Sequence, residues 1–598
     1  MKWTLPVVLA LSVVVFGCRN KPAPVEEKTT PPEKTPSSSS SFTSRSRPSP
    51  PNVHGRITDE AGRPLRAHIE LWRLPWNGSY SYRYSADESP TPTTAPSFDN
   101  EELVDAGSAN EKGWFHLNAG YGDYLVRVCK GPEWEIREMK FSVSYRGEVP
   151  RIDVSLRRLY DLKPTGWYSG DVHHHSCYSD GLQTPAQVYE AALALDCDFL
   201  ALSDHNTAAQ STEWLEYAGN GFLPIPACEI TPYQSWRQRS DGVAFGHLGV
   251  LGLTTLANPK GTPESTYPSW RYEYESWDDV QGAIDKTHAA GGLFVLNHPM
   301  FFNLGGSDAI NGWERIRDYD AIEIFNGGTV GPFMISLKPT GPVINYNTLA
   351  TLIWFEMLSA GNRVSAVAGS DAHECNVAKR NPEGVSHWRP FTGNPRTYVR
   401  VRELTWPAVR TAIKRGNSFI TSGYWGPLLL VESNGSGPGD EIRIRPGDQL
   451  PLHIEVKSNR PLKGAHDGIR IILGGKVVQE LPTPEGQMSV SIDTRVKVDT
   501  TSDTWIVVQA FGEYPSAAMT NPIYLDVPPH DGWGAKEWTF PADAEYWCKP
   551  WPIAPQTTIS DWPALPPPRK QPARSEEDPM DRRDEEPDGG SEEDSTGG

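Results

Sequence analysis

The sequence predicts a multidomain protein of α/β plus β class, with a central α/β domain between two β-sandwich domains. Short strands separated by turn residues occupy 52–158, strands alternate with helices over 159–423, and short strands return at 424–527. Strands that alternate with helices are typical of a parallel sheet, whereas short strands with turns between them are typical of sandwiches. With 598 residues, the chain is long enough to give each of these parts its own core.

The N-terminus is predicted to be a secretory signal, residues 1–18. An apolar run at 5–16 follows Lys2 and ends at Gly17 and Cys18, which is too short for a bilayer span but typical of a signal peptide. Residues 15–18 (Val-Phe-Gly-Cys) resemble the lipobox of bacterial lipoproteins. That resemblance implies lipidation of Cys18 and an exported lipoprotein in the cell envelope, at the outer membrane or its periplasmic face, held in an outer leaflet by its lipid. An ordinary signal peptide with a coincidental cysteine is the alternative.

Residues 19–51 are rich in Pro and Ser and are predicted to form a disordered tether. The first sandwich follows at 52–158, where Gly55, Asp59, Gly62 and Pro64 mark a strand and a turn. This spacing resembles carboxypeptidase-regulatory-like or transthyretin-like modules. The stretch contains no cluster of ionisable residues, so we expect it to serve as a spacer or docking module.

The central region, 159–423, contains four predicted helices. Thr184-Pro185-Ala186-Gln187 has the pattern of a capping box that opens the first helix. Further helices are predicted after Ser276 and over 348–360 and 407–415. Strands at 199–202 and 293–296 are apolar throughout, which is typical of strands buried on both faces. The pattern predicts a parallel sheet, either open or closed into a barrel.

The C-terminal part contains a second predicted sandwich at 424–527 and a Trp- and Pro-rich extended segment at 528–568. The tail, 569–598, is predicted to be disordered, because 575–598 holds eleven acidic residues against two arginines. The net charge of −19 comes without any stripe of basic residues, which argues against a nucleic-acid partner.

Candidate metal ligands lie just after the apolar strands of the central region. The carboxyl ends of barrel strands converge on one face, so residues far apart in the sequence would meet there. In His173-x-His175 the strand period of two directs both rings to the same side, and His174 is expected to point away in a supporting role. His288 lies within a helix and is expected to be packed. The nine candidates are His173, His175, Asp180, His205, Glu229, His247, His298, Asp371 and His373.

The motifs around these residues resemble the polymerase-and-histidinol-phosphatase (PHP) domain, and more narrowly its CehA/McbA-like branch. They are His173-x-His175 with Ser179-Asp180-Gly181, Ser203-Asp204-His205-Asn206, Glu229, Gly246-His247-Leu248, Asn297-His298-Pro299, Glu323-Ile324-Phe325-Asn326-Gly327 and Ser370-Asp371-x-His373. The resemblance implies a distorted seven-stranded (β/α)7 TIM-like barrel that holds two to three divalent metal ions. Asp180 stands where some members of the superfamily use histidine.

The resemblance also implies how the ligands are shared. The first metal would be held by His173, His175, Glu229 and Asp371. Glu229 would bridge to a second metal bound by His247 and His298, and a third would be bound by Asp180, His205 and His373. Imidazole and carboxylate ligands suit Zn, Mn or Fe. The ligands that we also expect to take part in catalysis are Glu229, Asp371, His373 and His205.

The expected activity is hydrolysis of a small-molecule ester, with a phosphoester first, by a water molecule that the metals activate. No Ser or Cys nucleophile is needed, and no G-x-S-x-G motif occurs. Hydrolysis of a carboxyl ester, carbamate or amide at the same site is the second hypothesis. A surface protein that only sequesters metal or glycan is the third. The residues expected to orient ligands or substrate are Asn206, Asn297 and Asn326, and weak candidates for the general acid are Asp204 and Glu323.

Three cysteines, Cys177, Cys228 and Cys375, lie within two residues of a predicted ligand. We expect them to be buried, inert thiols; a disulfide at the mouth of the site or a metal thiolate are the alternatives. No C-x-x-C pair occurs, so zinc held by thiolates is not indicated.

Overall fold

The computed structural model describes 52–74, 91–92, 102–143, 151–231, 246–255, 276–299, 316–327, 334–336, 343–376, 391–464, 468–511, 517–529 and residue 533. Cys18, the tether 19–51, most of the 528–568 segment and the tail 569–598 lie outside these residues, so the predictions for them stay predictions. Within the described ranges, no helix combines the length and the apolar character that a membrane span needs.

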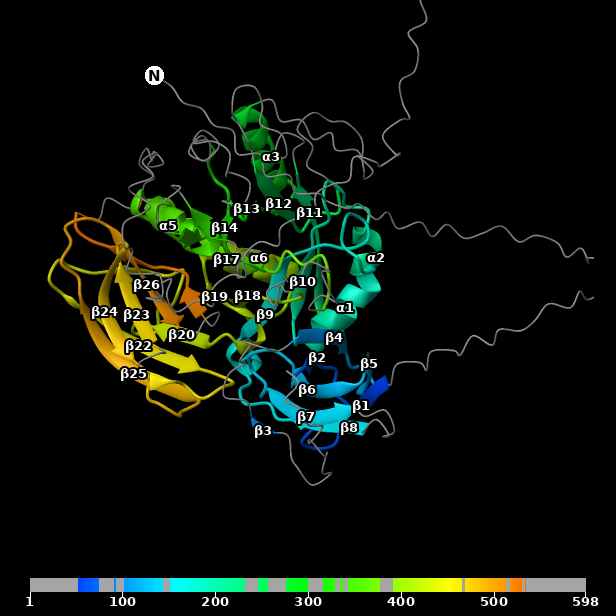
Figure 1. Cartoon of the computed structure of the whole chain (residues 1–598). Coiled ribbons are helices and arrows are strands. Elements are labelled where there is room, and N and C mark those ends of the chain that lie inside the picture. Colours follow the sequence, from blue (N-terminus) through cyan, green and yellow to red (C-terminus); the bar gives the residue numbers. More distant parts are fainter. Residues whose placement is uncertain are drawn as a thin grey trace, which may run out of the picture. The chain divides into compact units, whose positions relative to one another are not determined.

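The N-terminal strands form two sheets that enclose a common apolar core (Figure 1). One sheet has the order β5(Trp114–Asn118), β1(Asn52–Asp59), β8(Arg151–Leu156). The other has the order β3(Thr91–Pro92), β7(Arg137–Val143), β6(Gly122–Cys129), β2(His68–Arg73), β4(Glu102–Ser108). Exposed and buried residues alternate along β5 and β8, as expected for strands with one face on a core.

The central strands form a continuous stretch of one large sheet. Their order is β17(Ser365–Gly369), β14(Ala321–Asn326), β13(Leu293–Asn297), β12(His247–Leu251), β11(Leu223–Ile230), β10(Phe199–Leu202), β9(Trp167–His174). Most neighbours are parallel, but β12 is antiparallel to both β11 and β13. The prediction of a parallel sheet is therefore wrong at β12, because the chain re-enters the sheet at the end where β11 leaves it. It is also wrong at β18(Arg396–Arg400), which lies in the same predicted region and pairs antiparallel with β9.

Helices cover this stretch of the sheet. They are α1(Pro185–Ala194), α2(Ser211–Leu215), α3(Trp277–Ala289), α5(Tyr346–Ser359) and α6(Trp406–Arg415), with short 3-10 turns η1(Lys163–Thr165) and η5(Gly423–Trp425). The capping box predicted at Thr184 is present, and Gly416 ends α6 with a φ of 78°. Val280 and Ile284 of α3 pack in one cluster with Phe294 of β13, which fixes this helix on the sheet.

The closed barrel predicted from the sequence is not shown, because no ladder of strand hydrogen bonds joins β17 to β9 among the described strands. The chain just after β17 does contact β9: the Asp371 amide donates to the His173 carbonyl (2.8 Å), and the His175 amide donates to the Ala372 carbonyl (3.0 Å). The structure is therefore a strand-rich α/β sheet whose first and last central strands meet at one end.

The C-terminal strands extend the same sheet beyond β9. The extension runs β18(Arg396–Arg400), β19(Ser418–Thr421), β27(Ala517–Thr520), β26(Thr504–Phe511), β23(Gly468–Leu473), β24(Lys476–Pro482), with β28(Ile523–Asp526) and β21(Glu441–Arg443) at its side. A second sheet has the order β20(Leu428–Glu432), β22(Gln449–Lys457), β25(Ser489–Lys497), and β15(Met334–Ser336) pairs with β16(Val343–Asn345). Pairing of β19 with β27 means that hydrogen bonds cross the boundary predicted at 423/424.

Candidate metal centre

The nine predicted ligands come from six strand ends and meet at one rim of the central sheet. His173, Glu229 and His247 lie in β9, β11 and β12, and the other six follow β9, β10, β13 or β17 in the loops. Parallel strands bring their carboxyl ends to one rim. His247 joins them because its strand runs the opposite way, so that the first residue of β12 lies beside Asn297, the last residue of β13.

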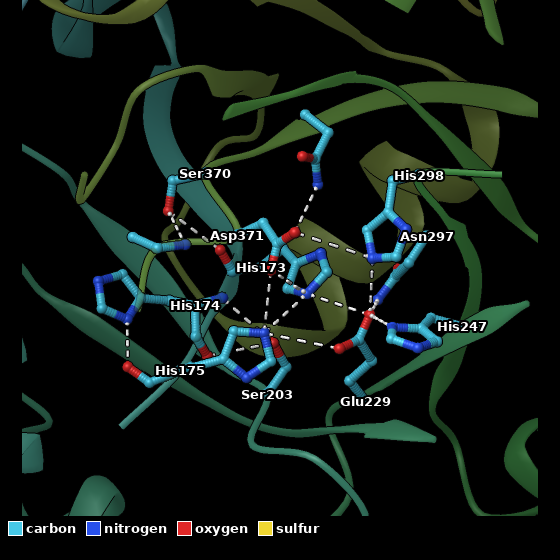
Figure 2. A network of polar contacts seen from close by, with 12 residues as sticks. His173, His174, His175, Ser203, Glu229, His247, Asn297, His298, Ser370 and Asp371 are labelled. Atoms are coloured by element: carbon cyan, nitrogen blue, oxygen red, sulfur yellow. Dashed lines mark hydrogen bonds and ion pairs between the residues drawn. The ribbon is translucent and has the colours of Figure 1, made fainter. Parts of the chain in front are cut away.

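Glu229 lies at the centre of the cluster and is fully buried. Its carboxylate oxygens lie 2.9 Å from His205 Nδ1, 3.0 Å from His298 Nε2 and 3.2 Å from His247 Nδ1. His173 Nε2 is 3.3 Å away on another side. Figure 2 shows this carboxylate facing the rings of His247 and His298 with His173 close by. One carboxylate group therefore faces imidazoles from four separate segments.

His173 and His175 point to the same side of β9, as their spacing predicts. Their Nε2 atoms are 3.2 Å apart, and Asp371 Oδ1 lies 3.4 Å from the first and 3.1 Å from the second. The Nδ1 atom of His175 is buried without a hydrogen-bond partner, and Asp180 Oδ1 is 3.9 Å from it. Two facing imidazole nitrogens and a buried nitrogen without a hydrogen-bond partner fit a site that holds a cation between them.

The outer end of the cluster is formed by Asp180, His205 and His373. Asp180 Oδ1 lies 3.2 Å from His373 Nε2, and Asp180 Oδ2 lies 3.6 Å from His205 Nε2. The side chains of His373 and Asp180 are 37% and 40% exposed, whereas Glu229 is inaccessible. The cluster therefore has a buried end and an end that opens to solvent.

These side chains satisfy a simple test of fit for metal binding. Four groups of them have ligand atoms that all lie within 4.8 Å of one another: His175, Asp180, His205 and His373; His173, His175 and Asp371; His173, His298 and Glu323; and His205, Glu229 and His247. Ligand atoms about 2.0–2.2 Å from a shared Zn²⁺ ion are necessarily within about 4.4 Å of one another. Nitrogen and carboxylate oxygen donors are found at sites for Zn, Mn and Fe.

The pKa values of two buried carboxylates and of two buried histidines suit metal ligands. Burial alone would raise the pKa of Glu229, but the neighbouring His247 and His173 hold it well below its ordinary value. The pKa of Asp371 is lowered in the same way, against burial, by His173 and His175. Burial lowers the pKa of His175 to about 3 and that of His247 to about 4, so both rings are neutral. For His173 and His373 the nearby carboxylates of Glu229 and Asp180 outweigh burial and raise the pKa, so a metal ion would have to displace a proton from these rings. Ionised carboxylates and neutral imidazoles are the forms that coordinate metals.

Glu323 supports the cluster from behind and was expected only as a weak candidate for the general acid. Its carboxylate lies 3.2 Å from His173 Nδ1 and accepts from the His298 amide (2.9 Å) and from Asn326 Nδ2 (3.0 Å). A carboxylate on the far nitrogen of a ligand histidine fixes its ring and tautomer. Glu323 therefore orients His173, and the Asn326 amide also donates to Asp371 Oδ2 (3.3 Å).

The other two predicted asparagines have different contacts. Asn297 Nδ2 donates to Glu229 Oε1 (3.0 Å), so it orients the central carboxylate. Asn206 exchanges hydrogen bonds with the backbone of Thr231 (2.9 and 2.8 Å) and thereby joins the ends of two strands. Asp204 accepts from the hydroxyls of Ser176 and Ser179 and from the Ser176 amide. These three bonds hold the fully buried Asp204 carboxylate in place.

His174 and His288 lie away from the cluster, as predicted. His174 is buried, and its ring contacts the His175 carbonyl (2.8 Å) and the Thr392 hydroxyl (2.9 Å). His288 Nε2 lies 2.8 Å from Asp320 Oδ2. Cys228 and Cys375 are buried free thiols whose pKa values burial raises, that of Cys375 to about 12, so they are in the form expected for inert thiols. Neither belongs to a group of possible ligands in the described residues.

Asp171 was missed in the sequence, although it directly precedes Val172 and His173. Its fully buried carboxylate accepts three backbone hydrogen bonds, from His173 (3.1 Å), Ser370 (2.9 Å) and Gly393 (2.8 Å). It therefore joins β9 to the turn that carries Asp371. An acidic residue inside a strand, two positions before a predicted ligand, was the available indication, because such a group must have partners when it is buried.

No family model and no curated protein matches this chain. Among solved structures, it is similar to a two-domain protein of Bacteroides vulgatus described as containing a PHP-like metal-dependent phosphoesterase (14% identity, 60% of this chain, 96% of that chain, TM-score 0.33). It is also similar to an amidohydrolase of Chromobacterium violaceum with bound sulfate (17% identity, 37% of this chain, 93% of that chain, TM-score 0.23). A third similar structure is a protein of Bifidobacterium adolescentis described as a metal-dependent phosphoesterase (17% identity, 37% of this chain, 92% of that chain, TM-score 0.21). With TM-scores below 0.5, these likenesses assign neither a family nor an activity to this chain.

Proposed function

We propose that this chain is a metal-dependent hydrolase of the CehA/McbA-like branch of the PHP superfamily, and that it hydrolyses phosphate esters with an activated water molecule. The observation that carries the proposal is the convergence of six imidazoles and four carboxylates into four overlapping ligand groups. A protein that only binds a single metal ion needs about four such donors. A larger and shared set suits neighbouring cations that act together on one substrate.

When bound, two neighbouring divalent cations lower the pKa of a water molecule from about 15.7 toward about 7 and neutralise the oxygen atoms of an ester. The chain's own residues prepare the place for this chemistry. Glu229 presents its two oxygens to imidazoles on both sides, and Asn297 and Glu323 hold the ligands in position. Burial of Glu229 excludes other water from the inner end, while Asp180 and His373 leave the outer end accessible.

Charge favours a phosphoester over a neutral carboxyl ester, carbamate or amide. The cluster contains the carboxylates of Asp180, Glu229, Glu323 and Asp371. Three divalent cations would bring six positive charges against these four negative ones, so a site loaded with three would carry a net positive charge, whereas two cations would only balance the carboxylates. A positive pocket attracts an anionic substrate and stabilises the negative charge that develops on phosphoryl oxygens.

The proposed architecture is a closed, distorted (β/α)7 barrel around this site. Two features support closure in addition to the hydrogen bonds between β9 and the chain after β17. One apolar cluster contains side chains from all seven central strands, including Val172 of β9 and Val367 of β17. Val409 and Ile413 of α6 belong to the same cluster and would plug the end of the barrel opposite the metal centre.

The proposed location is the cell envelope, with the protein anchored in the outer leaflet through lipid on Cys18. The lipobox-like residues 15–18 and the Pro- and Ser-rich tether after them support this proposal. Labelling with a radioactive or clickable fatty acid should mark the wild-type chain, while Cys18→Ala should be unlabelled and released from membranes. Labelling of Cys18→Ala to the wild-type level would refute lipidation at this residue.

The function is tested by metal analysis and by a substrate panel. Purified protein should contain two to three equivalents of transition metal, and less than one equivalent would contradict every enzyme hypothesis. p-Nitrophenyl phosphate, a phosphodiester and p-nitrophenyl acetate are then assayed with and without chelator, in protein loaded with Zn, Mn or Fe. Turnover of phosphoesters that chelator abolishes is expected. Turnover of acetate alone would favour carboxyl-ester chemistry, and bound metal without any turnover would favour a sequestering protein.

A further inference from the structure

A short buried segment, 391–394, lies behind the strand that carries the first two ligands. Thr392 is fully buried, and its hydroxyl lies 2.9 Å from His174 Nε2. The other ring nitrogen of His174 lies 2.8 Å from the carbonyl of His175. His174 is thus held at both nitrogens, and its two neighbours in the sequence are ligands of the proposed metal site.

The partners determine which atom donates. A carbonyl oxygen only accepts, so His174 Nδ1 carries the proton and donates to the His175 carbonyl. The Nε2 atom is then an acceptor, and the Thr392 hydroxyl donates to it. A buried threonine hydroxyl that donates to Nε2 can still accept, and the Cys375 thiol also hydrogen-bonds with Thr392. Thr392 therefore connects the chain beyond His373 with the chain between His173 and His175.

Gly393 makes the second connection. Its amide donates to Asp171 Oδ2 (2.8 Å), and Asp171 Oδ1 in turn accepts from the amides of His173 and Ser370. Gly393 has a φ of +66°, and a Cβ at this position would lie 2.7 Å from Cys197 Sγ, so no other residue fits. Buried Arg396 holds the segment from the other side by donating to the Gly393 carbonyl (2.9 Å).

The first residue of the segment packs against the N-terminal sheet. The ring of Phe391 stacks on buried His68 of β2, with centroids 5.4 Å apart and an interplanar angle of 11°. Tyr424 lies on another side of Phe391, at 5.8 Å, and its hydroxyl donates to Glu70 Oε1 of the same strand β2 (2.8 Å). The segment is thus packed between β2 and the ligand strand β9.

We infer that the 391–394 segment positions the metal centre, with Thr392 as the positioning residue for His173 and His175 and with the N-terminal sheet as its support. This rests on the proposed function, because it concerns the ligands of that site. It also gives the N-terminal sheets a role other than that of a spacer. The segment follows the last ligand, His373, in the sequence and contains no ligand itself, so it acts on the cluster only by holding neighbouring residues in place.

Thr392→Val tests the positioning role, because it keeps the shape of the side chain and removes the hydroxyl. Metal retained by the full-length protein is measured by elemental analysis after dialysis against increasing chelator. Losing a group that orients metal ligands lowers metal affinity about 10–100-fold, and we expect the lower end here because Thr392 acts through His174. Thr392→Ser restores the hydroxyl and should retain metal like the wild type.

Thr520→Val is the matched control. Thr520 is buried too, and its hydroxyl accepts a hydrogen bond from the Val508 amide (3.0 Å) in strands away from the cluster. The Thr520→Val variant should lose about as much thermal stability as Thr392→Val and keep its metal. If Thr392→Val retains metal as Thr520→Val does, while the wild type is fully loaded, the inference is refuted and the proposed function stands. A wild-type protein that binds no metal would instead refute the proposed function.

His68→Leu tests the support from the N-terminal sheet. It removes the ring that stacks on Phe391 and the contact of that ring with Glu70 (3.5 Å), and it places an apolar side chain in the same buried position. We expect metal to be lost at lower chelator concentrations than from the wild type. Unchanged metal retention in this variant would show that β2 has no part in holding the segment.

Discussion

Glu229→Gln is the substitution that most directly tests the proposed centre. The amide keeps the size of the side chain but removes a negative charge that lies 2.9–3.3 Å from nitrogens of His205, His298, His247 and His173. The attraction between this carboxylate and one positive charge at about 4 Å, such as that of a bound cation, is worth about 4 kcal/mol at an effective dielectric constant of about 20. Since about 1.4 kcal/mol corresponds to a factor of ten, kcat/KM should fall at least about 10³-fold.

The assay compares kcat/KM on the best phosphoester, metal equivalents per chain and the circular dichroism spectrum. We expect at least one equivalent of metal to be lost while the spectrum is unchanged. Glu133→Gln is a control for the loss of a buried carboxylate, because Glu133 is buried and pairs with Arg158 (2.9 Å) outside the cluster. Full metal content with kcat/KM within tenfold of the wild type would refute the central role of Glu229.

Three further outcomes are expected. Chelator should remove metal in two phases, the first from the end of the cluster where Asp180 and His373 are 40% and 37% exposed. The variant Asp180→Asn should lack only the equivalent that is lost first. Loss of all metal in a single phase would contradict this asymmetry. Burial opposes the ionisation of Glu70, yet hydrogen bonding and the charge of Arg127 lower its pKa from 4.5 to about 2, so stability present above pH 4.5 is lost toward pH 2. This amounts to about 3 kcal/mol in chemical denaturation of the metal-free protein, and Glu70→Gln should lose that pH dependence. The Cys228 thiol, whose pKa burial raises, should react with a thiol reagent only after denaturation, and its reaction in the folded protein would show that the site opens.

The strands and most helices of the central region could be predicted because they depend on local patterns. The apolar run at 199–202 and the capping box at Thr184 are properties of a few neighbouring residues, and both are present in the structure. The direction of β12 is not such a property. A strand that begins with His247 has the same side-chain alternation in either direction, so only its pairing with β11 and β13 determines that it is antiparallel.

The site illustrates the same limit. Histidines and acids beside apolar strands indicate ligands, and the predicted positions do come together, although His247 begins its strand instead of following one. Glu323 and Asp171 were assigned weakly or missed because their roles depend on what faces them across the sheet: His173 Nδ1 for the first, and the amides of Ser370 and Gly393 for the second. Nothing in the spacing of a single sequence reveals partners about 150 to 220 residues away.

The asymmetry of the cluster constrains how a substrate reaches it. Glu229 has no exposed surface, whereas Asp180 and His373 are open to solvent, so the ester of the proposed reaction would enter from their end. The Leu182 amide donates to the His373 carbonyl (2.8 Å), and the Leu182 side chain is the most exposed large apolar one among the described residues, at 57%. The open end therefore combines charged ligands with an apolar neighbour. Under the proposed function, an ester with an anionic head and an apolar leaving group would contact both, whereas a free inorganic anion would contact only the charged part.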